Sequence, residues 1–354
     1  MVYNPNKAIH PGYIIARSLE REGMSQKNLS ERTGLTEKHI SQIINGEASI
    51  TIETALLLEN ALGGSASFWI NLEKNYQETK IRLERAPLLR KEAGLLPKFP
   101  YKELVKRGYV EQATNSDKKV ENLWKFFGVN SLFFVQNTEA VAYRKKSGLE
   151  IKTEAIATWL RCGELEFKKE SLPEYSESKL KESLPKIKLL SVNDPSEFSK
   201  ELVKILSNAG VSLIYIPHFS GTGVSAAVRW INNNPLIQLS VYYPWADIFW
   251  FNLYHEIGHL VLHGKKEKFI EFDDKALSVV QEKEKEANKF AGDELISEKS
   301  YIEFLRKPLS KRGIIDFAKN LSIHPGIVAG RLCYDGKVKW SQVSGLRPRL
   351  KCVQ

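Results

Sequence analysis

Hydrophobic and polar positions repeat with two different periods along this chain of 354 residues. Residues 8–80 predict several short helices separated by Gly-containing turns, and residues 81–200, rich in Lys and Glu, are also mostly helical in pattern. From Val211 hydrophobic residues follow the pattern typical of β-strands, and from Trp245 they again follow the pattern typical of helices. We therefore expect a multidomain protein, mainly α with an α+β part, divided into domains 1–80, 81–200 and 201–354.

The middle region contains helices whose ends are marked in the sequence. One begins at Ser116 and stops at Gly128, and a second ends near Gly163. The charged run from Lys168 to Lys188 predicts an exposed connector. We expect residues 81–200 to form a helical linker or sensor region.

Three short β-rich runs follow, at residues 211–216, 224–231 and 236–242. Turn signals at residues 221–223 and 232–235 separate them, which predicts a small antiparallel sheet.

Two short helices near the N-terminus have the spacing of a helix-turn-helix. Ser25 and Thr36 can each cap a helix, and Gly34 between them can adopt the positive φ of a sharp turn. The second helix leaves an outer face for base contacts, which comprises Thr36, Glu37, Lys38, Ser41 and Gln42. Gln26, at the start of the first helix, is placed to hold a DNA phosphate.

A wider set of motifs surrounds this pair of helices: His10-Pro11-Gly12, Ser25-Gln26-x-x-Leu29-Ser30, Gly34-Leu35-Thr36, Ile43-Ile44-Asn45-Gly46 and Phe68-Trp69-Ile70-Asn71-Leu72. Together they resemble the Cro/CI-type (XRE) helix-turn-helix of HigA/VapI-like antitoxins. The resemblance implies a lambda-repressor-like, all-α domain of five helices that binds operator DNA as a homodimer. Residues on its reading helix correspond to Glu37, Lys38 and Gln42.

Charge and composition add limits rather than a function. The net charge of +10 resides outside residues 1–80, which are nearly neutral, so DNA binding depends on the motif. No stretch is apolar enough for a membrane helix, and the first residues lack the apolar core of a secretory signal. Cys162, Cys333 and Cys352 are far apart, which favours free thiols and a cytoplasmic location.

The clearest chemical motif is His255-Glu256-Ile257-Gly258-His259. On a helix the two histidines lie one turn apart on one face, so both imidazoles can bind one Zn²⁺ ion. Glu256 is suited to act as general base on the attacking water. The neighbouring residues are mostly apolar, as in a buried helix, where unpaired polar groups are costly.

The third ligand must come from elsewhere, since Val261 and Lys265 stand where a metzincin needs Gly and His. The charged run 282–291 predicts a helix, and Glu286 borders its apolar stripe. Glu282 and Asp293 share that face as alternatives, whereas Glu284 is expected to project elsewhere. Without further information, a charged helix face exposed to solvent is a simpler explanation of this run than a metal ligand.

The sequence from Leu239 through His263-Gly264 is similar to the ImmA/IrrE family of metallo-endopeptidases, and so is Glu284-x-Glu286-Ala287-Asn288-x-Phe290-Ala291. The resemblance implies a zincin-like α+β domain in which Glu286, before Ala-Asn, is the third zinc ligand. A C-terminal segment, residues 324–332, also resembles this family. Ser297-Glu298 stands where the family often has Pro, which affects a loop and leaves the ligands unchanged.

Other histidines have ordinary structural explanations. We expect His263 to interact with the last carbonyls of the motif helix, His324 to lie in a turn, and His218 to be structural, although a residue beside the sheet could donate to an oxyanion. Tyr254 is expected to pack in the core.

Two functions fit these modules. The first is a DNA-binding regulator that cleaves a repressor, or itself, in a stress, prophage or toxin-antitoxin switch. The second is a HigA-type antitoxin that neutralises a cognate toxin and represses its own operon, with the zincin domain serving a structural or sensing role. A zinc site with a purely structural role is a third reading, which an intact Glu256 disfavours.

Overall fold

The chain folds into two compact units in the computed structural model. The first unit runs to Gly94 and includes Asn115–Lys118, and the second contains Leu95–Thr114 and the chain from Lys119 onward. The expected boundary at residue 80 falls inside a helix that continues to Ala93. The structure describes residues 7–135, 152–193, 195–222, 225–240, 245–264 and 274–348.

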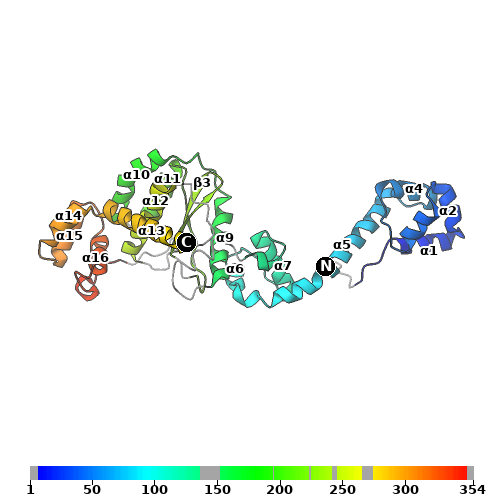
Figure 1. Cartoon of the computed structure of the whole chain (residues 1–354), viewed down its shortest axis with the longest axis horizontal. Coiled ribbons are helices and arrows are strands. Elements are labelled where there is room, and N and C mark those ends of the chain that lie inside the picture. Colours follow the sequence, from blue (N-terminus) through cyan, green and yellow to red (C-terminus); the bar gives the residue numbers. More distant parts are fainter. Residues whose placement is uncertain are drawn as a thin grey trace. The chain divides into compact units, whose positions relative to one another are not determined.

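The described residues of the first unit form five helices before Gly94, as the resemblance implies (Figure 1). Each helix contributes to one apolar core, which contains Ile15, Leu29, Ile40, Leu58 and Trp69. The helices are α1 (Gly12–Glu22), α2 (Gln26–Thr33), α3 (Glu37–Ile44), α4 (Ile52–Leu62) and α5 (Ala66–Ala93).

Local signals at the helix ends work as the sequence indicates. The Ser25 side chain accepts a hydrogen bond from the Asn28 N–H, and Thr36 accepts one from the His39 N–H. Gly34 between these helices has a φ of 71°, a left-handed conformation that suits glycine. The turn is therefore encoded locally, and packing of α2 against α3 completes it.

The second unit combines helices with one small sheet. The elements before the sheet are η1 (Leu96–Lys98), α6 (Tyr101–Lys106), η2 (Leu132–Val135), α9 (Thr153–Phe167), α10 (Glu177–Leu189), η3 (Leu190–Val192) and α11 (Pro195–Asn208), together with α7 (Ser116–Phe127), which begins in the part assigned to the first unit. After the sheet come α12 (Ala246–Leu262), α13 (Asp274–Leu295), α14 (Glu298–Leu305), α15 (Lys311–Asn320), α16 (Pro325–Tyr334) and η5 (Trp340–Val343).

The sheet is mixed rather than purely antiparallel. Its strands are β1 (Ser212–Tyr215), β2 (Ala226–Ile231) and β3 (Asn234–Leu239), in the order β1-β3-β2. The β2–β3 hairpin is antiparallel, as the turn at Asn232 predicts, but β1 pairs parallel with β3, with Ser212 opposite Leu236. A parallel partner is set by tertiary packing, and no local turn signal specifies it.

Two expectations for the middle region are wrong. Helix α9 continues past Gly163 to Phe167. Packing accounts for this glycine, since its missing side chain makes room for the Gln238 amide, which donates to the Trp159 carbonyl at 2.7 Å. The charged run expected to be an exposed connector contains α10, whose Leu180 and Ile187 are fully buried. Charged residues between the apolar positions make the apolar stripe of α10 hard to recognise in the sequence.

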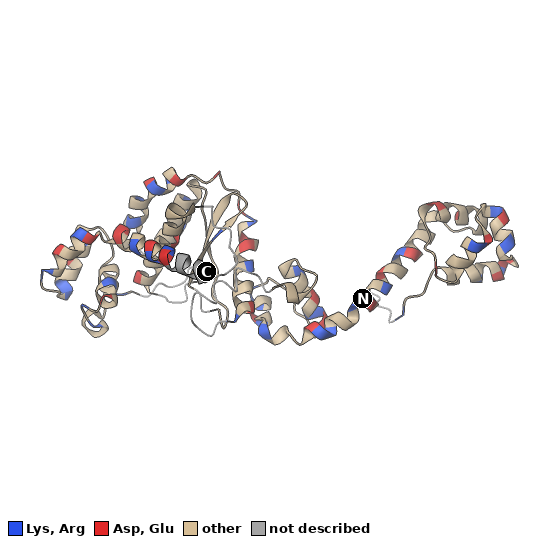
Figure 2. Ribbon diagram, in the orientation of Figure 1, with Lys and Arg blue, Asp and Glu red and all other residues tan. Residues whose placement is uncertain are grey.

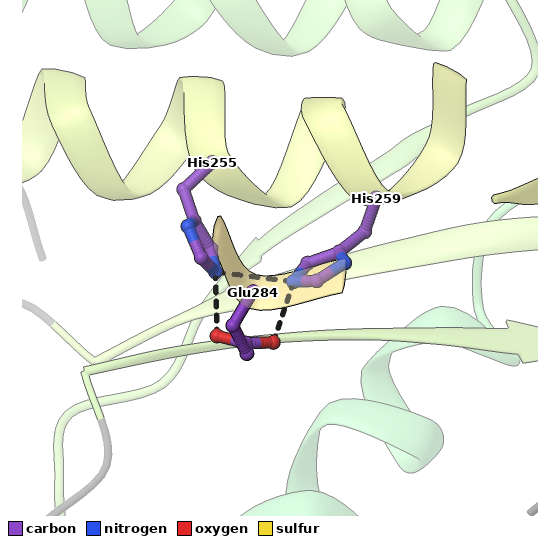
Figure 3. A group of neighbouring side chains, drawn as sticks. All are labelled: His255, His259 and Glu284. Carbon is purple, nitrogen blue, oxygen red and sulfur yellow. Dashed lines mark hydrogen bonds and ion pairs between the residues drawn. The ribbon is translucent and has the colours of Figure 1, made fainter. Parts of the chain in front are cut away.

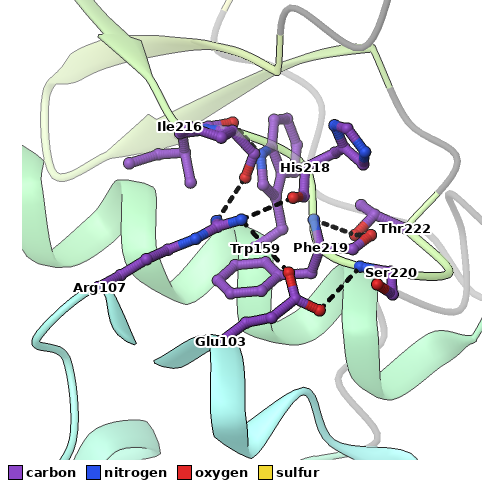
Figure 4. Close-up of polar contacts among 9 residues, drawn as sticks. Glu103, Arg107, Trp159, Ile216, His218, Phe219, Ser220 and Thr222 are labelled. Atoms are coloured by element: carbon purple, nitrogen blue, oxygen red, sulfur yellow. Dashed lines mark hydrogen bonds and ion pairs between the residues drawn. The ribbon is translucent and has the colours of Figure 1, made fainter. Parts of the chain in front are cut away.

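Helix α6 fixes the loop that follows β1 (Figure 4). The Arg107 guanidinium donates to the carbonyl oxygens of Pro217 at 2.6 Å and His218 at 2.7 Å. The Glu103 carboxylate accepts from the Ser220 N–H at 3.2 Å. His218 therefore belongs to a loop whose backbone is held by side chains of another element.

Surface charge and membrane propensity agree with the composition. Lysine and arginine alternate with acidic residues along the helices of both units (Figure 2). No helix in the described part of the chain combines the length and the apolar character that crossing a bilayer requires. Cys162 and Cys333 are free thiols, and burial raises the pKa of Cys162 to about 12, whereas Cys352 lies outside the described residues.

Candidate metal centre

Helix α12 carries the H-E-x-x-H motif through the core of the second unit. Trp250, Leu253 and Tyr254 on this helix are fully buried, and the Tyr254 hydroxyl donates to the Leu184 carbonyl at 2.8 Å. At its N-terminal end, Asp247 forms an ion pair with Arg347 at 2.8 Å. The two histidines therefore stand on a rigid scaffold.

Helix α13 packs closely against α12, and small residues make this possible. A β-carbon at Gly258 would lie 3.4 Å from the Ala287 Cα and 3.0 Å from the Phe290 ring. Ala287 and Ala291 are fully buried in the contact. Because the helix axes approach this closely, a short carboxylate side chain on α13 can reach the histidines of α12.

Three side chains meet between these helices: His255, His259 and Glu284 (Figure 3). The Nε2 atoms of the two histidines are 3.1 Å apart. The Glu284 carboxylate lies 3.3 Å from His255 Nε2 and 3.0 Å from His259 Nε2. Both imidazoles and the carboxylate thus converge on one point.

The donor set fits zinc. Around a tetrahedral ion with bonds of about 2.0–2.1 Å, ligand atoms are about 3.3 Å apart, close to the separations found here. Two imidazole nitrogens and one carboxylate also leave one position open, as in catalytic zinc sites. The three side chains are partly buried, so a bound ion would remain accessible to a substrate.

The structure brings Glu284 to the histidines, and not Glu286, the ligand expected from the resemblance. The expectation that Glu284 projects away from the site is wrong. Glu286 has a side chain 55% exposed, and its carboxylate lies 3.7 Å from His263 Nδ1. Glu282 is also exposed, and Asp293 lies two turns further along α13.

The spacing along α13 contains the signal that identifies Glu284. Glu284, Ala287, Asn288 and Ala291 lie at positions i, i+3, i+4 and i+7, which form one face of a helix. Ala287 and Ala291 are the buried residues of that face, so Glu284 points into the contact as they do. Glu286 lies two residues further along the helix, about 200° around its axis from Glu284.

Asn288 orients the first histidine. Its side-chain oxygen lies 3.0 Å from His255 Nδ1, which suits a hydrogen bond in which Nδ1–H donates and Nε2 keeps its lone pair for a metal. The sequence alone did not indicate this role for Asn288. Its position four residues after Glu284 places it on the same helix face.

The structure also places the other candidate residues of the second unit, Glu256, His263 and His324. Glu256 is buried, with 7% of its surface exposed, directly after His255. His263 ends α12, and its Nε2 lies 3.4 Å from the Lys283 carbonyl. His324 caps α16, where its Nδ1 accepts from the Gly326 N–H at 2.9 Å. Burial lowers the pKa of His324, an effect that the Asp247 carboxylate partly opposes.

In the first unit, the residues assigned to DNA reading lie on or beside α3. Thr36, Glu37 and Lys38 are exposed at its N-terminal end, and Ser41 and Gln42 are partly buried one turn later. Gln26 is exposed at the start of α2. Their contacts with DNA stay a prediction.

Comparison with known proteins supports both modules. A sequence model of the helix-turn-helix family matches residues 15–69, and a model of the IrrE N-terminal-like domain matches residues 219–332. Over 74 residues the chain is 34% identical to virulence-associated protein I of Dichelobacter nodosus, an alignment that covers 21% of this chain and 68% of that protein.

Two solved structures are similar to part of the chain. An addiction module antidote protein of the HigA family from Coxiella burnetii is 32% identical, with 24% of this chain and 95% of that chain covered and a TM-score of 0.23. An antidote protein of a plasmid maintenance system from Nostoc punctiforme is 33% identical, with 22% and 93% covered and a TM-score of 0.20.

Fold and site together define a DNA-binding regulator of the helix-turn-helix class that also contains a peptidase-type domain. The chain belongs to the Cro/CI-type (XRE) helix-turn-helix family that includes virulence-associated protein I, and its C-terminal part is an IrrE N-terminal-like domain. Both resemblances noted in the sequence are thereby confirmed.

Proposed function

We propose that this regulator binds operator DNA through α3 and is also a zinc-dependent endopeptidase. Its active site, where a protein substrate is cleaved, contains a zinc ion held by His255, His259 and Glu284. One observation carries the proposal: two histidine nitrogens and one carboxylate converge within 3.3 Å of one another, directly beside Glu256 in the sequence. A buried carboxylate next to the ligands has no use in a purely structural site.

Each residue has a defined role in this proposal. His255, His259 and Glu284 hold the ion, and Asn288 keeps the His255 ring in the orientation that binding needs. When bound, zinc acidifies water and polarises the scissile carbonyl. Glu256 takes the proton from the attacking water and returns it to the departing amine. The water oxygen bonds to the carbonyl carbon and the C–N bond breaks, which leaves a carboxylate on one fragment and an amine on the other.

Metal analysis of purified protein tests the proposal directly. We expect one zinc per chain in the wild type and in Glu256→Gln, and none in His255→Ala. The wild type should cleave an unfolded protein substrate, and Glu256→Gln should lower the cleavage rate by a factor of about 10² or more. A wild type that binds no zinc after reconstitution, or equal cleavage by both zinc-loaded proteins, rejects the proposal.

A second function is favoured by the similarity to virulence-associated protein I and to antidote proteins. In this proposal the chain is a homodimeric antitoxin that neutralises a toxin encoded beside it and represses its own operon. Coexpression with that toxin distinguishes the two proposals. Protection that survives Glu256→Gln supports an antitoxin, whereas protection that is lost in this variant supports a peptidase role.

A further inference from the structure

A histidine just before α1 holds the first turn of that helix. The N–H of Gly12, the first residue of α1, donates to His10 Nδ1 at 3.0 Å. An N–H in the first turn has no acceptor within its own helix, and leaving it unpaired is costly where the residue is buried, as Gly12 is. The neutral imidazole of His10 therefore supplies an acceptor that the start of α1 needs.

The His10 ring lies where three elements of the first unit meet. On α5, the Tyr76 ring packs edge-on against it, with the ring centroids 4.6 Å apart. A β-carbon at Gly46, just after α3, would lie 3.4 Å from His10 Cγ. Turning the ring away from the Gly12 N–H would break these contacts as well, so the packing keeps Nδ1 directed at α1.

Helix α1 begins directly against the end of α3. A β-carbon at Gly12 would lie 2.7 Å from the Ile44 Cα and would also collide with the Ile43 carbonyl oxygen. Ile43 is buried in the core of the first unit. Because the two backbones touch here, the position of the first turn of α1 limits the position of α3, which carries the residues assigned to base reading.

The same three residues begin a helix in the second unit. In His324-Pro325-Gly326 the imidazole Nδ1 again accepts from the glycine N–H two residues later, at 2.9 Å. The glycine is again in close contact with another segment, since a β-carbon at Gly326 would lie 2.9 Å from the Leu346 carbonyl oxygen. His-Pro-Gly thus recurs as a helix start that depends on a titratable acceptor.

We propose that His10 is a positioning residue for DNA recognition: its neutral imidazole holds α1 against the end of α3, and its protonation lowers the affinity for operator DNA. A protonated Nδ1 carries a hydrogen and cannot accept from the Gly12 N–H. The first turn of α1 then loses its acceptor and α3 loses a fixed neighbour. This inference rests on the DNA-binding function and is independent of the peptidase proposal.

The groups that face the His10 ring decide where it titrates. Helix α5 contributes Tyr76, the Glu73 carboxylate, which favours the imidazolium, and Lys80, which opposes it, whereas Gly46 after α3 is uncharged. Burial has the largest effect and lowers the pKa of His10. The hydrogen bond is therefore fully present above the pKa of about 6.5 that histidine has in the unfolded chain, and it is lost as the pH falls through the lower folded pKa.

The affinity of the full-length protein for a duplex of its own upstream DNA, measured by fluorescence anisotropy at about pH 8 and about pH 5.5, tests the proposal. In His10→Asn the side-chain oxygen can accept from the N–H two residues later and does not titrate. We expect the wild type to lose about fivefold more affinity on acidification than His10→Asn does, the size expected for one lost hydrogen bond.

His39→Asn is the matched control, because His39 is the other histidine of residues 1–94 and lies on α3 itself. It should lose at least as much affinity on acidification as the wild type. His10→Asp is a second variant in case His10→Asn folds poorly, since a carboxylate accepts the same bond and stays ionised at both pH values. Equal losses in the wild type and the His10 variants overturn the proposal, and so does a loss that only His39→Asn removes.

Hydrogen exchange at about pH 5.5, followed by mass spectrometry, separates positioning from general unfolding. We expect the amides of α1 to exchange faster in the wild type than in His10→Asn, with those of α4 unchanged. Faster exchange throughout the first unit would show loss of the fold and overturn a positioning role. Absence of DNA binding at pH 8 would instead reject the DNA-binding function on which the inference rests.

Discussion

The side-chain oxygen of Asn288 lies 3.0 Å from Nδ1 of His255, so one residue of α13 fixes the ring that one residue of α12 presents to the metal centre. The same helix supplies Glu284 to that centre. Because both contacts come from one face of α13, its packing against α12 determines the geometry of the whole site.

Removing this hydrogen bond should weaken zinc binding without removing a ligand. We expect Asn288→Ala to lower zinc affinity by about 10–100-fold, the usual effect of losing a partner of a ligating histidine. Asn288→Asp keeps an acceptor and should stay close to the wild type. Competition with a chromophoric chelator measures the affinity, and Lys289→Ala, at the exposed neighbouring position, is the control.

The two nearby glutamates should differ sharply. Glu284→Ala removes a carboxylate that contacts both histidines and is expected to abolish stoichiometric zinc, whereas Glu286→Ala should retain it. Elemental analysis of the two purified variants gives the answer. The reverse result would restore Glu286 as the third ligand.

Gly258 should be intolerant of even one added carbon. In Gly258→Ala the new methyl group would press on the Phe290 ring, and overpacking of this kind costs about 1–3 kcal/mol of unfolding free energy. Gly94→Ala is the control, since Gly94 has a φ of −65° and its nearest atom would be 3.5 Å away. Urea unfolding of both variants measures the difference, and equal midpoints would contradict the close packing.

Stability of the second unit should fall as the solution is acidified, in part because of His324. Its pKa is lowered in the folded protein, since burial disfavours the charged form and Nδ1 must accept from the Gly326 N–H. The contribution of neutral His324 to the free energy of unfolding is therefore fully present above the pKa of about 6.5 that histidine has in the unfolded chain. It is lost as the pH falls through the lower pKa of His324 in the folded protein.

Urea midpoints at about pH 8 and about pH 5.5, measured with a chelator present, test this contribution. His324→Asn keeps a capping oxygen but cannot titrate, so its midpoint should decrease less on acidification than that of the wild type. Equal decreases in both proteins would show that His324 does not contribute.

DNA recognition should depend on the residues of α3 that are assigned to base reading. Substituting Gln42 or Lys38 by Ala should weaken binding to the protein's own upstream DNA by about 1–3 kcal/mol and relax its sequence preference. Lys74→Ala, on the exposed side of α5, should have a smaller effect. Fluorescence anisotropy with specific and scrambled duplexes distinguishes lost specificity from lost phosphate contact.

Local patterns in the sequence were sufficient to predict those features of the protein that a few neighbouring residues determine. The caps at Ser25 and Thr36 and the left-handed Gly34 define the helix-turn-helix, because a few adjacent residues set each of these features. The pairing of His255 with His259 follows in the same way from the fixed period of one helix.

Tertiary structure alone decided the features that depend on how distant elements meet. The choice of Glu284 over Glu286 depends on the rotation of α13 about its axis. Glutamates at alternate positions, 282, 284 and 286, point in several directions, and packing against α12 selects the face that Glu284 shares with the buried Ala287 and Ala291. The parallel pairing of β1 with β3 and the continuation of α9 past Gly163 likewise depend on partners far along the chain. Helix period is a local property, whereas the face that a helix buries is chosen by the elements packed against it.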